Sequence, residues 1–333
     1  MGDSILVTGG AGFIGSHLVE RLIDEGFLVD VVDDLSSGSL ANLSVARGNG
    51  GRGLRFHKLD IVAADLESLM SKLKPKAVVH LAARASVRES MRDPVSDANT
   101  NLIGSLRIMD AARRSEVSKI VFATSAGVYG QCTEADLPIS EESPHRPDSF
   151  YGLSKDSVLG YLRLYRDNFD LEYTALILAN VYGPRQGLHG EGGVIARFVE
   201  AALTNRQAEV FGDGEQTRDF LYVEDAVDAI FRALEQGGGQ TVNISTGVEV
   251  SVNTLHKEIH RISGLEYIPP HYSEQIPGEI ARSALDPRRA GWYLHWHPFT
   301  SLERGLNSLI EWYRTTQVTE TGPVSSRGRR IPR

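Results

Sequence analysis

The sequence is poor in cysteine, in long apolar runs and in positive charge. Its single cysteine, Cys132, cannot form an internal disulfide or supply a cluster of thiolate metal ligands. No apolar run approaches the roughly 20 residues that cross a bilayer, so we expect no membrane partner. The first residues lack the basic and long apolar segments of a secretory signal. We therefore expect a cytoplasmic protein.

Acidic residues outnumber basic ones. The 43 Asp and Glu against 35 Lys and Arg give a formal net charge of -8. Nucleic-acid binding draws on clustered basic side chains, and here these gather only in residues 325–333, which we expect to form a disordered tail. The charge argues against a nucleic-acid partner. With 333 residues, 41% of them hydrophobic, the chain can form one large or two modest globular domains.

Apolar spacing predicts alternating strands and helices in the first half of the chain. The predicted strands cover residues 5–7, 28–32, 54–59, 77–81, 119–124 and 172–178, and the predicted helices 65–73, 95–115 and 151–169. Strands joined by helix-length crossovers run parallel, and a parallel sheet needs helices on both faces. The first half therefore predicts a doubly wound α/β domain.

The second part of the chain predicts a smaller α/β lobe. From about residue 181 the segments are shorter and richer in Gly and Pro, with predicted helices near 194–204, 224–235, 252–263 and 301–314. We expect residues 1–180 to form the doubly wound domain and 181–333 the second lobe. Part of the second half, about 222–245, is expected to return to the first domain.

A glycine turn follows the first predicted strand. Gly9, Gly12 and Gly15 repeat every three residues at the start of a predicted helix, where bare backbone and free N–H groups suit a pyrophosphate. Asp33 ends the second predicted strand, where a carboxylate can accept hydrogen bonds from the adenosine ribose. Asp34 beside it adds negative charge that disfavours the extra phosphate of NADP. The pattern predicts an NAD-binding Rossmann fold, the alternative being a tight turn beside a solvated acidic pair.

Three residues predict acid/base chemistry. Tyr151 and Lys155 are four residues apart and share one face of a predicted helix. A tyrosine has an ordinary pKa of about 10, which a neighbouring ammonium and an oxidised nicotinamide lower by stabilising the phenolate. Ser125 ends the fifth predicted strand, at the edge where open α/β sheets bind ligands. The alternative is that Tyr151 and Lys155 only pack on one face of a helix and take no part in chemistry.

The chain resembles the extended short-chain dehydrogenases/reductases, and among them the nucleotide-sugar epimerases of the UDP-glucose 4-epimerase type. The resemblance covers about residues 4–312. It rests on an ordered set of motifs: 8–15 (TGGAGFIG), 32–35 (VDDL), 60–61 (DI), 80–83 (HLAA), 101–104 (NLIG), 124–130 (TSAGVYG), 151–155 (YGLSK), 180–186 (NVYGPRQ), 190–195 (GEGGVI) and 212–225 (GDGEQTRDFLYVED).

The resemblance implies further binding residues. Besides the glycines, the acids, Tyr151 and Lys155, those implied for the cofactor are Phe13, Ile14, Asp60, Ile61, Leu81, Ala82, Ala83 and Asn101. Those implied for a UDP-sugar, besides Ser125 and Tyr151, are Ser86, Arg88, Ala126, Asn180, Arg185, Val194, Arg218 and Ser283. For Arg218, a surface ion pair with Asp219 is the alternative. The helices near 95–115 and 151–169 resemble those that pair relatives into homodimers.

The resemblance also narrows the reaction. Relatives that dehydrate or decarboxylate the sugar carry an acid where this chain has Ala126 and Gly127. This leaves proton transfer at O4 and hydride transfer at C4. We expect an NAD-dependent 4-epimerase that works through a transient 4-keto sugar, with UDP-glucose and UDP-galactose as substrates. Tyr151 would take the O4 proton while Ser125 binds that oxygen.

Several alternatives stay open. Arg84 and Arg88 would suit a uronate, and the small Ser283 would admit an N-acetyl group. Ile276 stands where relatives carry an arginine that binds the diphosphate, and Arg282 could replace it. A nucleotide-sugar reductase or dehydrogenase, or an inactive NAD-binding scaffold, would be other classes of function. No His/acid spacing indicates a metal site.

Overall fold

The computed structural model describes residues 3–48, 53–187, 193–275 and 280–320. Ile276, residues 190–192 of the GEGGVI motif and the predicted disordered tail at 325–333 lie outside the described residues. In the part described, no helix is both long and apolar enough to cross a membrane.

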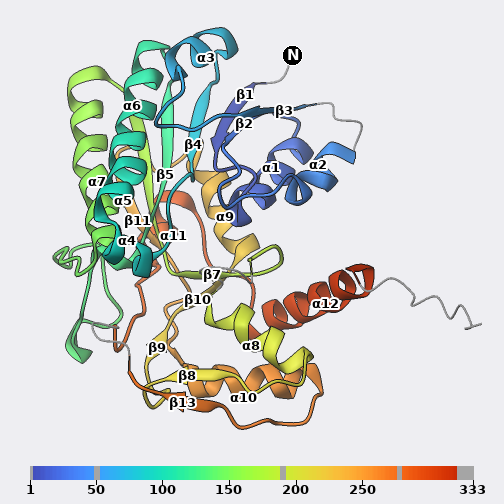
Figure 1. Cartoon of the computed structure of the whole chain (residues 1–333). Coiled ribbons are helices and arrows are strands. Elements are labelled where there is room, and N and C mark those ends of the chain that lie inside the picture. Colours follow the sequence, from blue (N-terminus) through green and yellow to red (C-terminus); the bar gives the residue numbers. More distant parts are fainter. Residues whose placement is uncertain (1–2, 49–52, 188–192, 276–279, 321–333) are drawn as a thin grey trace, which may run out of the picture.

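A seven-stranded parallel sheet forms the centre of the fold, in the order β11-β6-β5-β4-β1-β2-β3 (Figure 1). This confirms the predicted doubly wound sheet. The order reverses between β1 and β4, and ligands of open α/β sheets bind at such a reversal, beyond the carboxyl ends of the strands. The strands are β1 (Ser4–Thr8), β2 (Leu28–Asp33), β3 (Leu54–Lys58), β4 (Ala77–His80), β5 (Lys119–Ser125), β6 (Glu172–Leu178) and β11 (Gln240–Ile244).

Alternating side chains of the strands build two cores, one on each face of the sheet. Ile5 and Val7 of β1 belong to the core beneath α1 (Phe13–Asp24) and α9 (Val223–Ala233). Leu6 belongs to the core beneath the helices of the other face (Figure 1). Those helices are α3 (Leu66–Leu73), α6 (Ser105–Arg114) and α7 (Phe150–Phe169). Burial on both faces explains why the inner strands β1, β4 and β5 read as largely apolar runs, whereas the edge strand β3 (LRFHK) is only partly buried.

The predicted helix at 95–115 is three segments in the structure. A short helix, α5 (Pro94–Ala98), passes into a π-helical turn over Asn99–Gly104, and α6 follows. Asp93 caps α5 by accepting a hydrogen bond from the Ser96 N–H at 3.0 Å. The Ser105 hydroxyl donates to the Asn101 carbonyl at 2.5 Å within the wider turn. Such π turns occur often at functional sites.

The second lobe lies beyond the carboxyl ends of the strands, at the bottom of Figure 1. Its helices are α8 (Val194–Leu203), α10 (Val252–Ser263) and α12 (Leu302–Glu320). Its short strands pair as β7 (Asn180–Tyr182) with β10 (Phe220–Tyr222), β8 (Glu209–Phe211) with β13 (His271–Ser273), and β9 (Thr217–Arg218) with β12 (Val250–Ser251). The segment at 222–245 supplies α9 and β11, and β11 pairs with β6 of the main sheet. Shorter helices are α2 (Ser44–Gly48), α4 (Val87–Arg92) and α11 (Arg288–Leu294).

Candidate active site

The glycine turn packs directly onto the segment that follows β4, across the order reversal. Gly9 has a φ of +71°, and a Cβ there would lie 2.7 Å from the Ala82 nitrogen. A Cβ on Gly15 would lie 2.1 Å from the Gly9 carbonyl oxygen. Gly12, at the start of α1, provides no side-chain cap, and the first turn of α1 holds no acidic residue. The result is a cradle of bare backbone at a positive helix end, which fits the pyrophosphate of a dinucleotide.

Asp33 is tied to this turn. Its carboxylate is buried and accepts hydrogen bonds from the Ala11 N–H at 2.9 Å and the Leu35 N–H at 2.8 Å. Burial raises the pKa of Asp33, and these backbone bonds oppose the rise. Asp34 is exposed and binds Ser36 of its own loop at 2.6 Å and 2.8 Å. Asp33 is therefore fixed beside the glycine turn, whereas Asp34 stabilises the loop after β2.

The other predicted cofactor residues surround the same end of the sheet. Asp60 accepts from the Val62 N–H at 2.8 Å and so shapes the turn after β3. Ile61 is buried, and its side chain fills the space where a Cβ on Gly104 would lie. The Leu81 N–H donates to the Thr8 carbonyl at 3.1 Å, which places residues 81–83 beside the glycine turn. Phe13 and Ile14 begin α1.

Lys155 and Tyr151 are buried in the first turns of α7, with exposed fractions of 4% and 9%. The Lys155 ammonium donates to the Ala123 carbonyl of β5 at 2.9 Å and lies 4.6 Å from the centre of the Phe122 ring. Burial lowers the pKa of Lys155 to about 8. The Ser90 hydroxyl accepts from the Tyr151 N–H at 3.1 Å and joins α4 to this turn.

Ser125 lies where α7 meets the end of β5. A Cβ on Gly152 would lie 2.5 Å from the Gly127 carbonyl oxygen, so the first turn of α7 contacts the turn after β5. The Ser125 hydroxyl accepts from the Gly127 N–H at 3.2 Å. The same hydroxyl still has a proton to donate. The fold thus brings the predicted acid/base pair and the predicted oxygen-binding serine to one end of β5.

The residues implied for a UDP-sugar occupy several elements. Asn180 begins β7 and is exposed, and Val194 begins α8. Arg218 lies on β9, where its guanidinium donates to the Thr217 carbonyl at 2.7 Å. Asp219, the alternative partner of Arg218, accepts from the backbone of residues 246 and 247. Ser86 caps α4, Arg88 is exposed on it, Ala126 follows Ser125, and Ser283 is buried.

Two arginines are held by carboxylates. Arg185, implied for the substrate, donates from its Nη2 to both carboxylate oxygens of Glu20 of α1, at 2.8 Å and 2.9 Å. Its charge is thereby compensated within the protein, and its role as a substrate contact stays a prediction. Arg282, suggested as a replacement for an arginine at 276, binds Glu249 at 2.6 Å and Glu134 at 3.2 Å. That charge, too, is already compensated.

The sequence reasoning missed a buried hydrogen-bonded chain beneath the site. The His80 ring joins the Thr8 hydroxyl at 2.6 Å and the Ser105 hydroxyl at 2.9 Å. Burial, helped by the charge of Lys155, lowers the pKa of His80 to about 3 and keeps the ring neutral. These hydrogen bonds link β1, β4 and α6. Its sequence signal is a histidine at the end of an otherwise apolar strand.

Comparison with known proteins identifies the family. Residues 5–245 match the NAD dependent epimerase/dehydratase family. The chain belongs to this family. A UDP-glucose 4-epimerase of Mycolicibacterium smegmatis is 44% identical over 311 residues, 93% of this chain and 98% of that protein.

Solved structures of family members agree with this fold. The UDP-glucose 4-epimerase of Thermotoga maritima, solved with UDP-glucose, is 41% identical with a TM-score of 0.90, over 94% of this chain and 99% of that one. The UDP-glucose 4-epimerase of Thermus thermophilus, solved with NAD, is 34% identical with a TM-score of 0.86, over 93% and 99%. Among the residues that the structure of this chain describes, no group of three or more His, Cys, Asp or Glu side chains could hold a metal ion.

Proposed function

We propose that the protein is an NAD-dependent UDP-sugar 4-epimerase that interconverts UDP-glucose and UDP-galactose. The observation that carries the proposal is the buried Tyr151–Lys155 pair, which lies with Ser125 at the end of β5, on a fold whose glycine turn suits a dinucleotide. The likeness to UDP-glucose 4-epimerases over nearly the whole chain supports this choice of sugar.

Each catalytic residue has a separate task. Lys155 donates to a backbone carbonyl and keeps a positive charge near Tyr151, which stabilises the phenolate. Tyr151 then accepts the proton of the sugar O4 and later returns it. Ser125 donates a hydrogen bond to the same oxygen. When bound, NAD supplies the acceptor for the hydrogen at C4 and gives that hydrogen back, so no net oxidation results.

The turn after β5 limits what else the site can do. Ala126 and Gly127 offer no carboxyl group for a second proton transfer, at C5 or at a leaving hydroxyl. Arg218, on the short β9 strand, is the proposed partner of the substrate diphosphate, because a guanidinium binds anionic oxygens through paired donors. Asn180, Val194, Ser86 and Ser283 are the proposed contacts along the rest of the UDP-sugar.

The test begins with the nucleotide that copurifies. The protein is denatured, the released nucleotide is identified, and fresh protein is given UDP-glucose, UDP-N-acetylglucosamine and UDP-glucuronate in parallel, without added cofactor. We expect bound NAD and turnover of UDP-glucose. Activity on the uronate alone would overturn the choice of sugar, and a strict need for added NADPH would identify a reductase.

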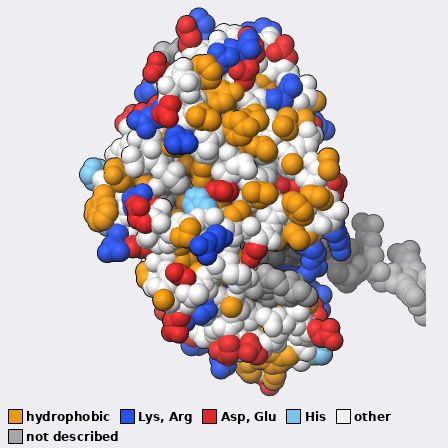
Figure 2. Space-filling view, turned by 90° about the vertical axis from the view of Figure 1, so that its left-hand side faces the viewer, with side chains coloured by type: hydrophobic (Ala, Val, Ile, Leu, Met, Phe, Trp, Pro, Cys, Tyr) orange, Lys and Arg blue, Asp and Glu red, His pale blue; other side chains and the backbone are white. Residues whose placement is uncertain are grey.

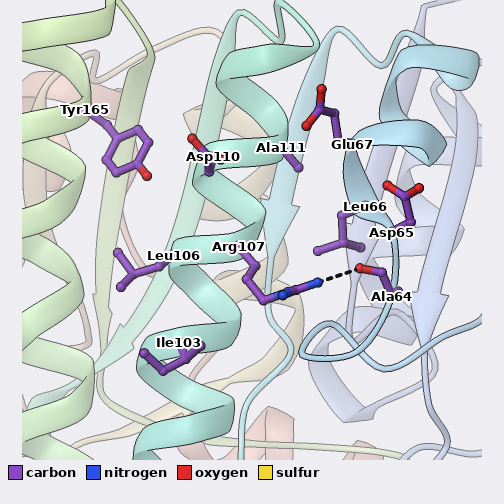
Figure 3. Close-up of a pocket in the computed structure, with 10 residues that line it drawn as sticks. All are labelled: Ala64, Asp65, Leu66, Glu67, Ile103, Leu106, Arg107, Asp110, Ala111 and Tyr165. Carbon is purple, nitrogen blue, oxygen red and sulfur yellow. Dashed lines mark hydrogen bonds between the residues drawn. The ribbon is translucent and has the colours of Figure 1, made fainter.

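We also propose that the protein is a homodimer that pairs through α6 and α7. This face carries exposed apolar side chains, including Leu153 and Leu164 of α7 and Ile103 just before α6. Figure 2, which views this side, shows hydrophobic side chains gathered across it. A groove of about 400 Å³ opens there between α3 and α6, and both apolar side chains (Leu66, Leu106, Tyr165) and charged ones (Asp65, Glu67, Arg107, Asp110) line it (Figure 3). Such a surface suits a second copy of the chain.

A further inference from the structure

A hydrogen bond from another helix holds the backbone of Tyr151, the proposed acid/base of the reaction. The Ser90 hydroxyl of α4 accepts from the Tyr151 N–H at 3.1 Å, although the two residues are 61 positions apart in the sequence. Ser90 is 2% exposed, so water competes little for this bond. The bond therefore joins α4 to the first turn of α7 in the interior of the protein.

The direction of this bond follows from the second bond that Ser90 makes. A serine hydroxyl has one proton to donate and lone pairs that accept. The Ser90 hydroxyl donates its proton to the Val87 carbonyl at 2.7 Å, within α4. Its lone pairs are left to accept from the Tyr151 N–H, and the hydroxyl cannot rotate without losing the bond to Val87. Ser90 is thus an acceptor of fixed orientation.

The place of Tyr151 in its helix makes this acceptor important. The first N–H groups of an α-helix have no acceptor within the helix, so they need acceptors from elsewhere. Ser149, which caps α7, accepts from the Gly152 N–H at 3.1 Å. Ser90 accepts from the neighbouring N–H of Tyr151. The first turn of α7 is therefore fastened at two successive N–H groups, and one of the two acceptors belongs to α4.

The same turn of α7 also contacts the turn after β5. A Cβ on Gly152 would lie 2.5 Å from the Gly127 carbonyl oxygen. The Tyr151 carbonyl accepts from the Ser154 hydroxyl at 2.9 Å, within α7. The close contact limits how near this turn can come to β5, and the bond to Ser90 limits how far it can move from α4. Together they define where the Tyr151 backbone lies.

The segment before α4 gives Ser90 a firm support. Ser86 caps α4 by accepting from the Glu89 N–H at 2.9 Å. Two residues earlier, the side-chain amide of the buried Asn101 accepts from the Arg84 N–H at 2.8 Å and donates to the Arg84 carbonyl at 3.0 Å. The backbone that leads into α4 is therefore tied to the π turn, and Ser90 inherits a fixed position.

We propose that Ser90 is a positioning residue, which holds the first turn of α7 where the Tyr151 hydroxyl can exchange a proton with the sugar O4. Ser90 acts through the Tyr151 backbone. Proton transfer depends on the placement of the reacting groups, so loss of this hold slows the chemistry and leaves substrate binding intact. The kinetic part of the inference rests on the proposed function, whereas the hold on the Tyr151 N–H stands without it.

Amide hydrogen exchange measures the hold directly. The chain has 11 tyrosines, so protein labelled with nitrogen-15 at tyrosine gives few amide signals, and Tyr151→Phe identifies the signal of interest by its loss. We expect the Tyr151 N–H to be protected in the parent and to exchange at least about tenfold faster in Ser90→Ala. Ser71→Ala is the matched control, because the Ser71 hydroxyl of α3 also bonds outside its own helix, to Ser115 at 3.1 Å, but at an exposed site.

Kinetic constants separate positioning from a merely structural role. In Ser90→Ala we expect kcat to fall about 10- to 100-fold, the loss that a displacement of about 1 Å can cause, with KM for UDP-galactose within about twofold of the parent and bound NAD retained. Ser90→Thr should keep kcat within about threefold, because a helical threonine can also direct its hydroxyl at the carbonyl three residues earlier. Ser71→Ala should keep full activity.

Each outcome bears on the inference. Rapid exchange of the Tyr151 N–H in the parent overturns it without any variant, and so does an unchanged exchange rate in Ser90→Ala. If the parent is active, an unchanged kcat in Ser90→Ala, a rise in KM that matches the loss of kcat, or an equal loss in Ser90→Thr contradicts it while the proposed function stands. A parent that epimerises no UDP-sugar but shows the expected amide exchange refutes the proposed function and sustains the hold of Ser90 on α7.

Discussion

At the scale of single residues, the proposed chemistry depends on one phenol. Replacing Tyr151 by Phe removes the group that takes and returns the O4 proton while keeping the buried ring. We expect kcat for UDP-galactose to fall by about 10²–10⁴, the usual contribution of a positioned acid/base. Steady-state assays of Tyr151→Phe beside Tyr161→Phe, an exposed tyrosine on the same helix, provide the comparison. Full activity in Tyr151→Phe would rule out the assignment.

Gly15 tests the dinucleotide cradle. A Cβ at this position would lie 2.1 Å from the Gly9 carbonyl oxygen and 2.8 Å from Gly10 Cα, so alanine must displace the turn. We expect Gly15→Ala to purify without bound NAD, as judged by the nucleotide released on denaturation. Gly48→Ala is the control, since its Cβ would meet no atom within 4 Å. A Gly15→Ala protein with a full complement of NAD would show that the turn does not hold the pyrophosphate.

At the scale of elements, α1 is joined to the loop after β7 by the Glu20–Arg185 pair. Both side chains are largely shielded, with exposed fractions of 20% and 16%. We expect Glu20→Gln to lower the free energy of unfolding by about 1 kcal/mol, because the arginine loses its counter-charge. Urea unfolding measures this, and KM for the UDP-sugar should not change. If Arg185→Lys instead raised KM tenfold with unaltered stability, Arg185 would be the substrate ligand that the resemblance implies.

The proposed pairing of two chains through α6 and α7 leads to a second prediction at the scale of elements. Leu164 on α7 is 49% exposed in the single chain. A glutamate there would bury a charge in the proposed dimer interface, so we expect Leu164→Glu to be monomeric in sedimentation velocity while the parent is a dimer. Val45→Glu places the same charge at an exposed position on α2 and should leave the dimer intact. A monomeric parent protein would contradict the pairing.

The elements also mark how far sequence reasoning reached. Inner parallel strands buried on both faces leave apolar blocks that are easy to read, and the partly buried edge strand β3 alternates apolar and polar residues. Six strands of the main sheet were therefore predicted nearly to their ends. The π turn at Asn99–Gly104 was not, because the apolar spacing continues across it. The ion pair of Arg185 was not predicted either, because Glu20 precedes Arg185 by 165 residues and only the fold brings the two together.

At the scale of the whole molecule, buried neutral histidines predict sensitivity to acid. Burial lowers the pKa of His80 to about 3 and those of His17 and His256 to about 4. The unfolded chain, in which histidine titrates near 6.5, then binds more protons between these values, so stability is complete above pH 6.5 and falls as the pH drops towards 4. At pH 5, the neutral state of each of these histidines lowers the free energy of unfolding by about 2 kcal/mol relative to its value above pH 6.5.

His256 isolates this effect. Its ring is 1% exposed, its two nitrogens have no hydrogen-bond partner in the described part of the chain, and it contacts Phe198 and Tyr267. Between pH 8 and pH 5, we expect the free energy of unfolding of His256→Phe to fall by about 2 kcal/mol less than that of the parent, as measured by urea unfolding. His271→Gln, at an exposed site, should follow the parent. Equal losses in parent and His256→Phe would show that this ring does not titrate with unfolding.

The most direct test of the central claim follows one hydrogen atom. Purified protein with its copurified nucleotide, and no added cofactor, is given UDP-galactose that carries deuterium at C4 of the sugar. If the bound cofactor takes this hydrogen and returns it to the opposite face, UDP-glucose forms with the deuterium still at C4, as mass spectrometry and NMR would show. Loss of the deuterium to solvent would contradict epimerisation through a 4-keto sugar whose C4 hydrogen the cofactor takes and returns.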